Sequence, residues 1–394
     1  MAEWTITTLE ACTDILGDGL HGTPIYSENG EYAFVNGNNL VDGEIVIKKD
    51  TKKVDESQYE KYKKSLSNRT ILVSINGTLG NVGTYNSEKI ILGKSACYFN
   101  VKNSVDKDFI YYVVSSPAFR QYLESNATGT TIKNISLKQM REYSFAMPSY
   151  EEQQRISSIL KTIDRKIKGN KEINNNLEQQ AEALFRSLFV DNANPTWKEG
   201  VLSDLGTIVA GGTPSKSKPE YYSEHGIAWI TPKDLSLNKS KFISHGEIDI
   251  SELGFSKSSA TKMPAGTVLF SSRAPIGYIA IAVNEVTTNQ GFKSVVPNEN
   301  IGTAFMYYLL KFLLPTIEGM ASGSTFKEIS AAGMKTVPVV IPDNMTIQKF
   351  NSFCTPIFQQ QEVLESENSR LADIRDSLLP KLMSGEIDVS NIDL

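Results

Sequence analysis

Two long stretches of the chain carry apolar residues three and four positions apart, separated mainly by Lys, Glu, Gln and Asn. In the first stretch, which starts at Glu151, the apolar residues are Ile156, Ile159, Leu160, Ile163, Ile167, Ile173, Leu177, Leu184 and Leu188. In the second, from about Thr346 to Pro380, they are Ile347, Phe350, Cys354, Ile357, Leu364, Leu371, Ile374 and Leu378. This spacing keeps the apolar side chains on one face, so it predicts two long amphipathic helices.

Both predicted helices begin just after a proline and a polar residue, Pro148–Ser149 and Pro342–Asp343. Ser and Asp side chains accept hydrogen bonds from first-turn N–H groups and are common N-caps. Pro356 lies near the start of the second helix. Because proline removes a helical hydrogen bond, a kink is expected there.

Helices of roughly 34 to 38 residues would be rods of about 50–57 Å. Such a rod cannot bury its apolar stripe alone, so we expect the two to pack on each other as an antiparallel coiled coil. One globular domain would then lie at each end, with pseudo-twofold symmetry. Polar residues interrupt the stripe and are predicted to fix the register of the pair: Asn174, Asn175, Asn176 and Asn368.

The segments between the helices have a different pattern, with short β-like runs and many turn signals. The clearest runs are ILVSI (71–75), TVLFSS (267–272) and IGYIAIAV (276–283), and short helical patterns cover 109–125 and 305–314. Asn-Gly, Asp-Gly and Pro-Ala-Gly sequences at 29–30, 76–77, 42–43 and 264–266 predict turns. We therefore expect an α+β fold with four segments: domain 1 (1–148), a central helix (149–191), domain 2 (192–342), and a distal helix with a C-terminal tail (343–394).

The two halves repeat each other. GTTIKNIS (129–136) returns as GSTFKEIS (323–330), 194 residues later, and ILVSINGTLG (71–80) returns as VLFSSRAPIG (268–277), 197 residues later. Trp4 and Trp197, the Tyr pairs at 111–112 and 307–308, and GTP at 22–24 and 212–214 follow in the same order. Matches in one order at nearly one spacing indicate a tandem duplication.

The composition is that of an ordinary globular protein, with 394 residues, 22% charged residues and a net charge of −5. The acidic excess lies at the end of the chain, because residues 345–394 carry 4 basic and 8 acidic groups. Lysines cluster locally in the two domains, at 48–53, 61–64, 216–218 and 239–241. Solvated loops and contact with nucleic-acid phosphates both explain such clusters.

Residue patterns that carry catalysis or metal binding are missing from the sequence. The three cysteines, Cys12, Cys97 and Cys354, form no CxxC pair, and the three histidines form no HExxH motif. No GxxxxGK[ST] phosphate loop occurs. Binding is therefore the expected role, without catalytic or metal-ligating residues. The absence of a signal peptide or long apolar segment leads us to expect a cytoplasmic protein.

The order of motifs resembles the specificity (S, HsdS) subunit of type I restriction-modification systems. The matching segments are FAMPSYEEQQRISSILKTID (145–164), GGTPS (211–215), PKDL (232–235), TNQGF (288–292), GSTFKEIS (323–330) and LLPKLMSGEI (378–387). The resemblance implies two target recognition domains that each read one half of a bipartite double-stranded DNA site, while the helices set the spacer. It also implies assembly with two methyltransferase (M) subunits and with restriction (R) subunits. S-adenosylmethionine, ATP and Mg would belong to those partners, with no cofactor in this chain.

Polar residues in the Gly-rich loops are the candidates for DNA contact, because their side chains offer donors and acceptors to base edges. They are Asn76, Thr78, Lys94, Thr131 and Lys133 in the first domain, and Ser272, Arg273, Asn289, Gln290, Lys293, Thr325 and Lys327 in the second. Arg273 is the first choice for a bidentate guanine contact, although an internal salt bridge or a phosphate contact suits it equally. Lys133 and Lys327 are equivalent in the repeat, which favours phosphate or structural roles.

Other functions stay open on the sequence alone. One is a recognition subunit of another restriction or methylation assembly, such as a fused methyltransferase-nuclease. Another is a coiled-coil scaffold whose domains bind protein or carbohydrate. A nuclease that uses scattered carboxylates is the least favoured.

Overall fold

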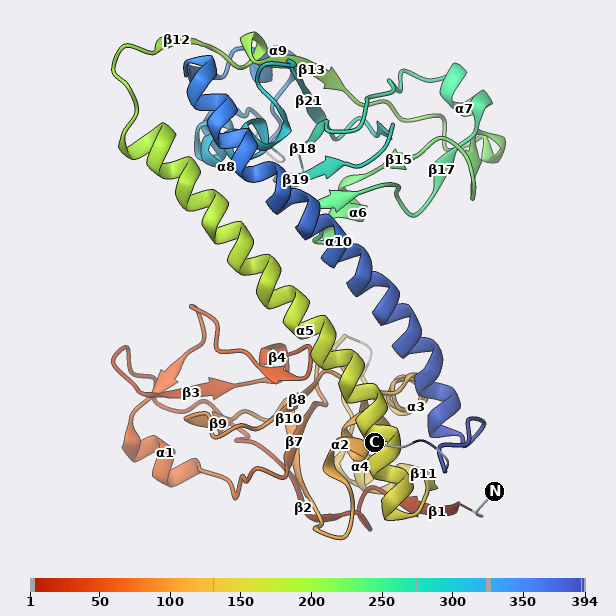
Figure 1. Ribbon diagram of the computed structural model, residues 1–394. Coiled ribbons are helices and arrows are strands. Elements are labelled where there is room, and N and C mark those ends of the chain that lie inside the picture. Colours follow the sequence, from red (N-terminus) through yellow and green to blue (C-terminus); the bar gives the residue numbers. More distant parts are fainter. Residues whose placement is uncertain (1–3, 130, 274, 324–326, 391, 393–394) are drawn as a thin grey trace. The chain divides into compact units, whose positions relative to one another are not determined.

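The computed structural model describes residues 4–129, 131–273, 275–323, 327–390 and 392. The chain divides into two compact units, one formed by residues 1–167 and 370–394 and the other by 168–369. Helices α5 (Tyr150–Arg186) and α10 (Asn344–Met383) are the long helices that the periodicity predicts, and each contributes residues to both units. Each unit therefore combines one mixed α+β domain with a part of both helices (Figure 1).

The first unit is built on an antiparallel sheet with the order β2 (Thr13–Asp18), β10 (Ala96–Val101), β7 (Thr70–Ser74) and β8 (Val82–Thr84). Every residue of the central strand β7 is buried. Side chains alternate along a strand, so Ile71 and Val73 enter one apolar cluster and Leu72 enters another. The sheet is thus covered on both faces.

Different elements cover these two faces (Figure 1). On one face lie α2 (Lys107–Ser115), α3 (Pro117–Asn126) and the adjoining ends of α5 and α10. On the other lies a small sheet of β6 (Lys53–Val54), β3 (Tyr32–Val35) and β9 (Ile90–Leu92), flanked by α1 (Glu56–Tyr62). The remaining elements are the 3-10 turn Gly37–Asn39, β4 (Leu40–Val41) with β5 (Glu44–Ile45), α4 (Leu137–Glu142), and β1 (Thr5–Thr8) paired with β11 (Ser144–Met147).

The second unit has a five-stranded sheet in the order β13 (Gly206–Ala210), β21 (Lys293–Pro297), β18 (Val268–Ser272), β19 (Ile276–Ala282) and β16 (Phe242–Ile243). The central strand β18 is again wholly buried, with Val268 and Phe270 facing one cluster and Leu269 facing the other. The long helix α8 (Thr303–Met320) covers the first face together with α5 and α10.

Short elements complete the second unit. A lobe on the other face of its sheet contains β14 (Tyr222–Ser223) with β17 (Asp249–Ile250), β15 (Trp229–Ile230) with β20 (Thr287–Thr288), α6 (Pro232–Leu237) and α7 (Glu252–Ser256). Near the helix ends lie the π-turn Ser187–Asp191, β12 (Lys198–Val201) with β22 (Pro338–Ile341), α9 (Ala331–Lys335) and the 3-10 turn Leu202–Asp204. The 3-10 turn Pro219–Tyr221 belongs to the lobe, where it contacts α7.

The strand pairing of the two domains follows the sequence repeat. Ile71 pairs with Thr84, and 197 residues later Val268 pairs with Ile281. The order β2-β10-β7-β8 recurs as β13-β21-β18-β19. The predicted α+β class and the three predicted strand runs are confirmed, since they become β7, β18 and β19.

The predicted caps of the long helices are also confirmed. Ser149 Oγ accepts from the Glu152 N–H at 3.3 Å, and the Glu152 carboxylate accepts from the Ser149 N–H at 3.1 Å. Asp343 Oδ1 accepts from the Thr346 N–H at 2.9 Å. Pro356 lies inside α10, and the helix continues through it without a break.

Two details of the helices differ from the prediction. The segment 109–125 forms two helices, because Ser116 leaves the helical conformation and caps a new first turn that opens with Pro117. Along α5 the buried amide that faces α10 belongs to Asn170, which is 1% exposed and donates to Asn368 Oδ1 at 2.9 Å. Asn175 and Asn176 are exposed, so the prediction that they interrupt the buried stripe is wrong.

Within each unit the segments of α5 and α10 are in contact. In the first unit Arg375 Nη1 lies 3.0 Å from Asp164 Oδ1. In the second unit Asn170 contacts Asn368, and the Asn174 carbonyl accepts from Gln361 Nε2 at 3.1 Å. Later residues of α5 there meet earlier residues of α10, so the two segments run in opposite directions.

Candidate nucleic-acid interface

A group of polar residues lies at the end of β7 in the first domain, and we call Asn76, Lys94, Lys133 and Asn134 the first loop cluster. Asn76 and Asn134 form an antiparallel backbone bridge, and Asn76 Nδ2 donates to Asn134 Oδ1 at 3.1 Å. The Gly77 N–H donates to the Lys133 carbonyl at 3.0 Å. Gly77 has φ +77°, a conformation that glycine adopts without strain. The chain can therefore turn at Asn76–Gly77 and place the Gly77 N–H against the Lys133 carbonyl.

A hollow of about 490 Å³ opens beside this cluster. It is lined by Asp18, His21, Ile75, Asn76, Lys94, Asn134, Ile135, Ser136 and Leu137. At its rim His21 Nε2 and Asp18 Oδ2 are 2.5 Å apart. Two predicted residues, Asn76 and Lys94, therefore share one concave surface with amide, ammonium and carboxylate groups.

The equivalent place in the second domain holds charged side chains, and we call Ser272, Arg273, Lys293 and Glu328 the second loop cluster. Arg273 Nη1 lies 3.5 Å from Glu328 Oε2, and Lys293 Nζ lies 3.4 Å from Glu328 Oε1. Lys293 is only 8% exposed and also lies 3.4 Å from Ser272 Oγ. One carboxylate thus holds two cations, and the cluster keeps an excess positive charge.

The backbone pairing of the two clusters is the same. Asn134 bridges both Asn76 and Thr128, and Glu328 bridges both Arg273 and Ser322. The neutral pair of the first domain is therefore replaced by an ion pair in the second. Asn134 and Glu328 were not among the predicted residues, although they occupy the position at which the repeated motifs KNIS and KEIS differ.

The remaining candidates divide into exposed and internal residues. Thr78, Thr131, Lys133, Gln290 and Lys327 are exposed, as a DNA contact requires. Their contact with DNA stays a prediction, and Thr325 lies outside the described residues.

Two candidates serve the inside of the domain. Ser272 is fully buried, and its hydroxyl lies 3.1 Å from the Gly291 carbonyl as a donor. Asn289 Oδ1 accepts from the Gly291 N–H at 2.8 Å, the pattern of an Asx turn. The prediction of direct DNA contact does not fit the burial of Ser272 or of Lys293, and the amide oxygen of Asn289 is engaged in shaping the loop.

The first domain is attached to the long helices through a small polar group. Tyr112 on α2 donates from its hydroxyl to Asp164 Oδ2 on α5 at 2.7 Å, and Asp164 also binds Arg375 of α10. Burial and the bond to Asp164 raise the pKa of Tyr112 above its ordinary value, so the phenol stays protonated as a donor.

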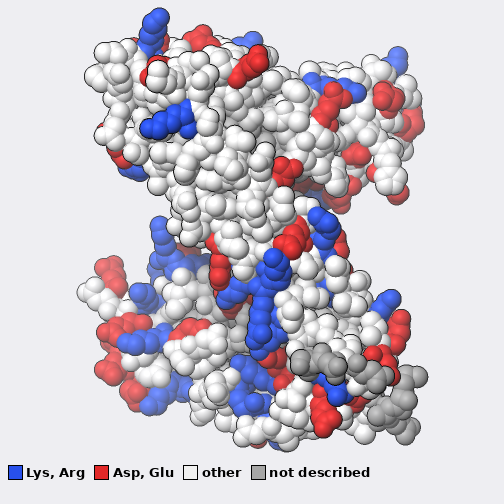
Figure 2. All heavy atoms as spheres, viewed as in Figure 1, with Lys and Arg blue, Asp and Glu red and all other residues white. Residues whose placement is uncertain are grey.

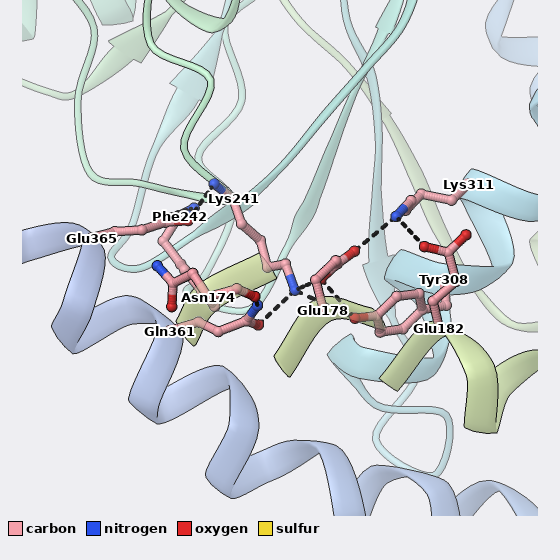
Figure 3. A network of polar contacts seen from close by, with 9 residues as sticks. All are labelled: Asn174, Glu178, Glu182, Lys241, Phe242, Tyr308, Lys311, Gln361 and Glu365. Atoms are coloured by element: carbon pink, nitrogen blue, oxygen red, sulfur yellow. Dashed lines mark hydrogen bonds and ion pairs between the residues drawn. The ribbon is translucent and has the colours of Figure 1, made fainter. Parts of the chain in front are cut away.

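The second domain is attached by a larger network around Lys241, which precedes β16 (Figure 3). Lys241 is 8% exposed. Its ammonium contacts the Glu178 carboxylate of α5 and donates to Gln361 Oε1 of α10 at 2.7 Å. Glu178 also accepts from Tyr308 at 2.8 Å and from Lys311 at 2.7 Å. The lysines at 239–241 were expected to contact phosphates or to lie on a solvated loop. Lys241 is buried, which fits neither expectation.

The charges of this network are strongly coupled. Burial acts to raise the pKa of Glu178, but the ammonium groups of Lys241 and Lys311 outweigh it and hold the pKa at about 2. Burial lowers the pKa of Lys241, against the opposing effect of Glu178. Burial also raises the pKa of Glu365, whose carboxylate accepts the N–H groups of Lys241 and Phe242. The ionised state of Glu178 is thus the one that the fold stabilises.

Acidic and basic side chains are interspersed over the first unit on the face in Figure 2, whereas in the second unit they lie mainly along the edges and on the lobe at the upper right, around a wide uncharged area. In the described part of the chain, no three His, Cys, Asp or Glu side chains are grouped so that they could hold a metal ion. Nor does any helix among the described residues have the length and apolar character needed to cross a membrane.

Comparison with known proteins identifies relatives along nearly the whole chain. Residues 19–179 and 194–363 each match the family model described as the type I restriction modification DNA specificity domain. The type I restriction enzyme MjaIX specificity subunit of Methanocaldococcus jannaschii is 35% identical over 193 residues, which is 47% of this chain and 44% of that protein. The HindI specificity subunit of Haemophilus influenzae is 25% identical, over 72% of this chain and 78% of that protein.

A solved structure has the same fold. The crystal structure of the type I restriction-modification system S subunit from M. genitalium superposes with a TM-score of 0.62 at 22% identity, covering 97% of this chain and 96% of the other. The two matches to the family model fall on the two halves that repeat each other in the sequence.

Proposed function

Because this chain belongs to the type I restriction-modification DNA specificity family, we propose that it supplies the sequence specificity of a restriction-modification complex. In this proposal each domain reads one half of a bipartite double-stranded DNA target. The two long helices form an antiparallel coiled coil that sets the spacer between the halves. The chain itself performs no catalysis.

The observation that carries the proposal is the pair of loop clusters. Equivalent backbone bridges present two amides in the first domain, Asn76 and Asn134, and an Arg–Glu pair in the second, Arg273 and Glu328. Amides pair best with adenine, arginine with guanine, and a carboxylate with the amino group of cytosine. One scaffold that carries two sets of base-reading groups is what two different half-sites require.

The partners follow from the same proposal. Two methyltransferase subunits would dock on the helices and carry S-adenosylmethionine, and restriction subunits would carry ATP and Mg. This chain would hold no cofactor of its own and would act in the cytoplasm, where the DNA is.

The proposal is tested by sequencing the methylated bases of genomic DNA from cells that carry the complete system. The wild-type chain should give one bipartite motif. Arg273→Ala should change methylation in only one half-site, and Asn76→Ala with Asn134→Ala only in the other. Lys198→Ala, which removes an exposed cation of the second domain outside both the long helices and the second loop cluster, is the matched control. A single continuous motif, or equal losses in both half-sites from Arg273→Ala, would contradict the proposal.

A further inference from the structure

The loop that precedes β16 occupies equivalent places in the two domains but carries different residues. In the second domain the Ile281 N–H donates to the Lys241 carbonyl at 2.7 Å. In the first domain the Thr84 N–H donates to the Gly43 carbonyl at 2.9 Å, and Gly43 forms a parallel bridge with Gly83. Thr84 and Ile281 are 197 residues apart, the spacing of the repeat in these strands. Gly43 therefore stands where the second domain has Lys241.

A lysine could not replace Gly43 without rearrangement. Gly43 has φ +82°, and a Cβ atom there would lie 2.5 Å from the hydroxyl of Tyr111. Tyr307 is the equivalent of Tyr111 in the repeat, and its ring centroid lies 4.9 Å from the ammonium of Lys241. The Lys241 network is thus a feature of the second domain, and the place that Lys241 fills is closed in the first.

Lys241 joins the recognition domain to both long helices at one point (Figure 3). Its side chain contacts Glu178 of α5 and Gln361 of α10. Its backbone N–H and that of Phe242 donate to the Glu365 carboxylate of α10, at 3.1 and 3.2 Å. From the same domain, Tyr308 of α8 reaches Glu178 as well. Each of these bonds has a required direction, so together they allow one orientation of the domain on the helices.

Stability alone does not account for a buried lysine at this place. Its ammonium lies 4.3 Å from the ring centroid of Phe358 and 5.4 Å from that of Tyr308, so an apolar side chain would find apolar contacts there. Well-packed apolar residues often stabilise a fold as much as a buried ion pair does. What an apolar residue lacks is the directionality of the hydrogen bonds.

We infer that Lys241 and Glu178 are positioning residues that fix the orientation of the second recognition domain on the helix pair and so restrict the target to one spacer length. This inference rests on the proposed function. A rotation of about 10° at the network would move a surface about 20 Å away by roughly one base-pair rise of 3.4 Å. A small loss of orientation is therefore enough to admit a neighbouring spacer.

The experiment compares variants of the full chain in cells that carry the complete system, by sequencing methylated sites and sorting them by spacer length. Lys241→Met removes the bonds of the ammonium to Glu178 and Gln361 and keeps the volume. Glu178 keeps its bonds to Tyr308 and Lys311, and the backbone bonds to Glu365 remain. We expect unchanged half-site sequences and about a tenfold rise in methylation at sites one base pair longer or shorter. Lys241→Arg should restore much of the selectivity. Lys239→Met, which removes an exposed charge two residues away, is the matched control.

Several outcomes would overturn the inference. One is an unchanged single spacer in Lys241→Met. Another is a changed sequence in the second half-site, which would make Lys241 part of base recognition. Loss of methylation at every spacer in both Lys241→Met and Lys241→Gln would show that the lysine supports the fold. In all these cases a bipartite wild-type motif leaves the proposed function standing, whereas a wild-type motif without two halves would remove it.

Discussion

The two loop clusters have one backbone design and two kinds of side chain. In the first domain Asn76 and Asn134 share a neutral hydrogen bond of 3.1 Å. In the second, Glu328 lies between Arg273 and Lys293 at 3.5 and 3.4 Å. The bridges that hold these residues are the same in both domains. The fold therefore fixes where a polar pair is presented and leaves its chemistry free to differ.

The attachment to the long helices differs between the domains in a related way. The first domain uses the Tyr112–Asp164–Arg375 group, in which Asp164 and Arg375 are each 31% exposed. The second uses the Lys241 network, in which Lys241 is 7% and Glu178 21% exposed at the side chain. Because an unpaired charge costs more free energy when it is buried than when it is exposed, the loss of one partner should destabilise the second attachment more than the first.

The largest expected effect comes from removing the central carboxylate of each attachment. Glu178→Ala leaves Lys241 without its carboxylate partner, and the loss of one partner of a buried pair costs about 3–5 kcal/mol. Asp164→Ala removes a half-exposed acceptor and should cost only about 1–2 kcal/mol. Hydrogen exchange resolved to the two units measures both losses in the full chain. Equal losses in the two units would refute the distinction between the attachments.

A smaller loss of stability of the second unit is expected on acidification. The pKa of Glu178 is about 2 in the folded chain, against an ordinary value of 4.5. A lowered pKa contributes stability that is present above pH 4.5 and is lost as the pH falls toward 2. Because a tenfold change in proton affinity corresponds to about 1.4 kcal/mol, the loss amounts to at most about 3 kcal/mol. Glu178→Gln should reduce the loss of stability of the second unit as the pH falls from 4.5 toward 2. An unchanged pH dependence would show that other groups produce it.

The parts that the sequence predicts are those that local patterns determine. The strand runs, the Ser149 and Asp343 caps and the repeat all depend on residues within a few positions of each other or on direct identity. The Ser116–Pro117 break in the predicted helix 109–125 had a local signal as well, since Ser followed by Pro is a common helix start.

The Lys241 network had no such signal. Lys241 is 63 residues from Glu178 and 120 from Gln361, and its burial depends on how β16 pairs with β19. The sequence-based prediction assigned the buried amide of α5 to the wrong residues for a related reason. Asn170 and Asn174–Asn176 are alike in composition, and only the direction in which each faces the partner helix separates them. Pairing between distant segments determines such contacts, so the neighbouring residues in the sequence do not indicate them.

The difference between the loop clusters can also be tested by removing the acceptor from each. Glu328→Ala releases Arg273 and Lys293 from their shared carboxylate and adds positive charge to the second loop cluster. Non-specific DNA affinity should rise by up to about tenfold at low salt. The slope of log affinity against log salt concentration should become more negative by roughly 0.9 for each added phosphate contact. Asn134→Ala, at the equivalent position, should leave the salt dependence unchanged. Titration of the full chain with DNA of unrelated sequence at several salt concentrations measures both. Equal slopes in the two variants would mean that Glu328 does not restrain the cations.

The smallest expected effect on stability comes from moving the charged pair into the first domain, with Asn76→Arg and Asn134→Glu. The backbone bridge is the same, and in the second domain Arg273 and Glu328 are 37% and 38% exposed at the side chain. Exposed ion pairs contribute about 0–1 kcal/mol, so the midpoint of thermal unfolding should shift by only a few degrees. Under the proposed function, the methylation motif should in contrast change in one half-site, toward a G·C pair in place of the A·T pair expected for the amides. The reverse exchange, Arg273→Asn with Glu328→Asn, is the matched control for the other half-site. A loss of stability above about 3 kcal/mol, as for a disrupted buried network, would show that the amides hold the first domain together, and that the two clusters share a backbone without sharing a role.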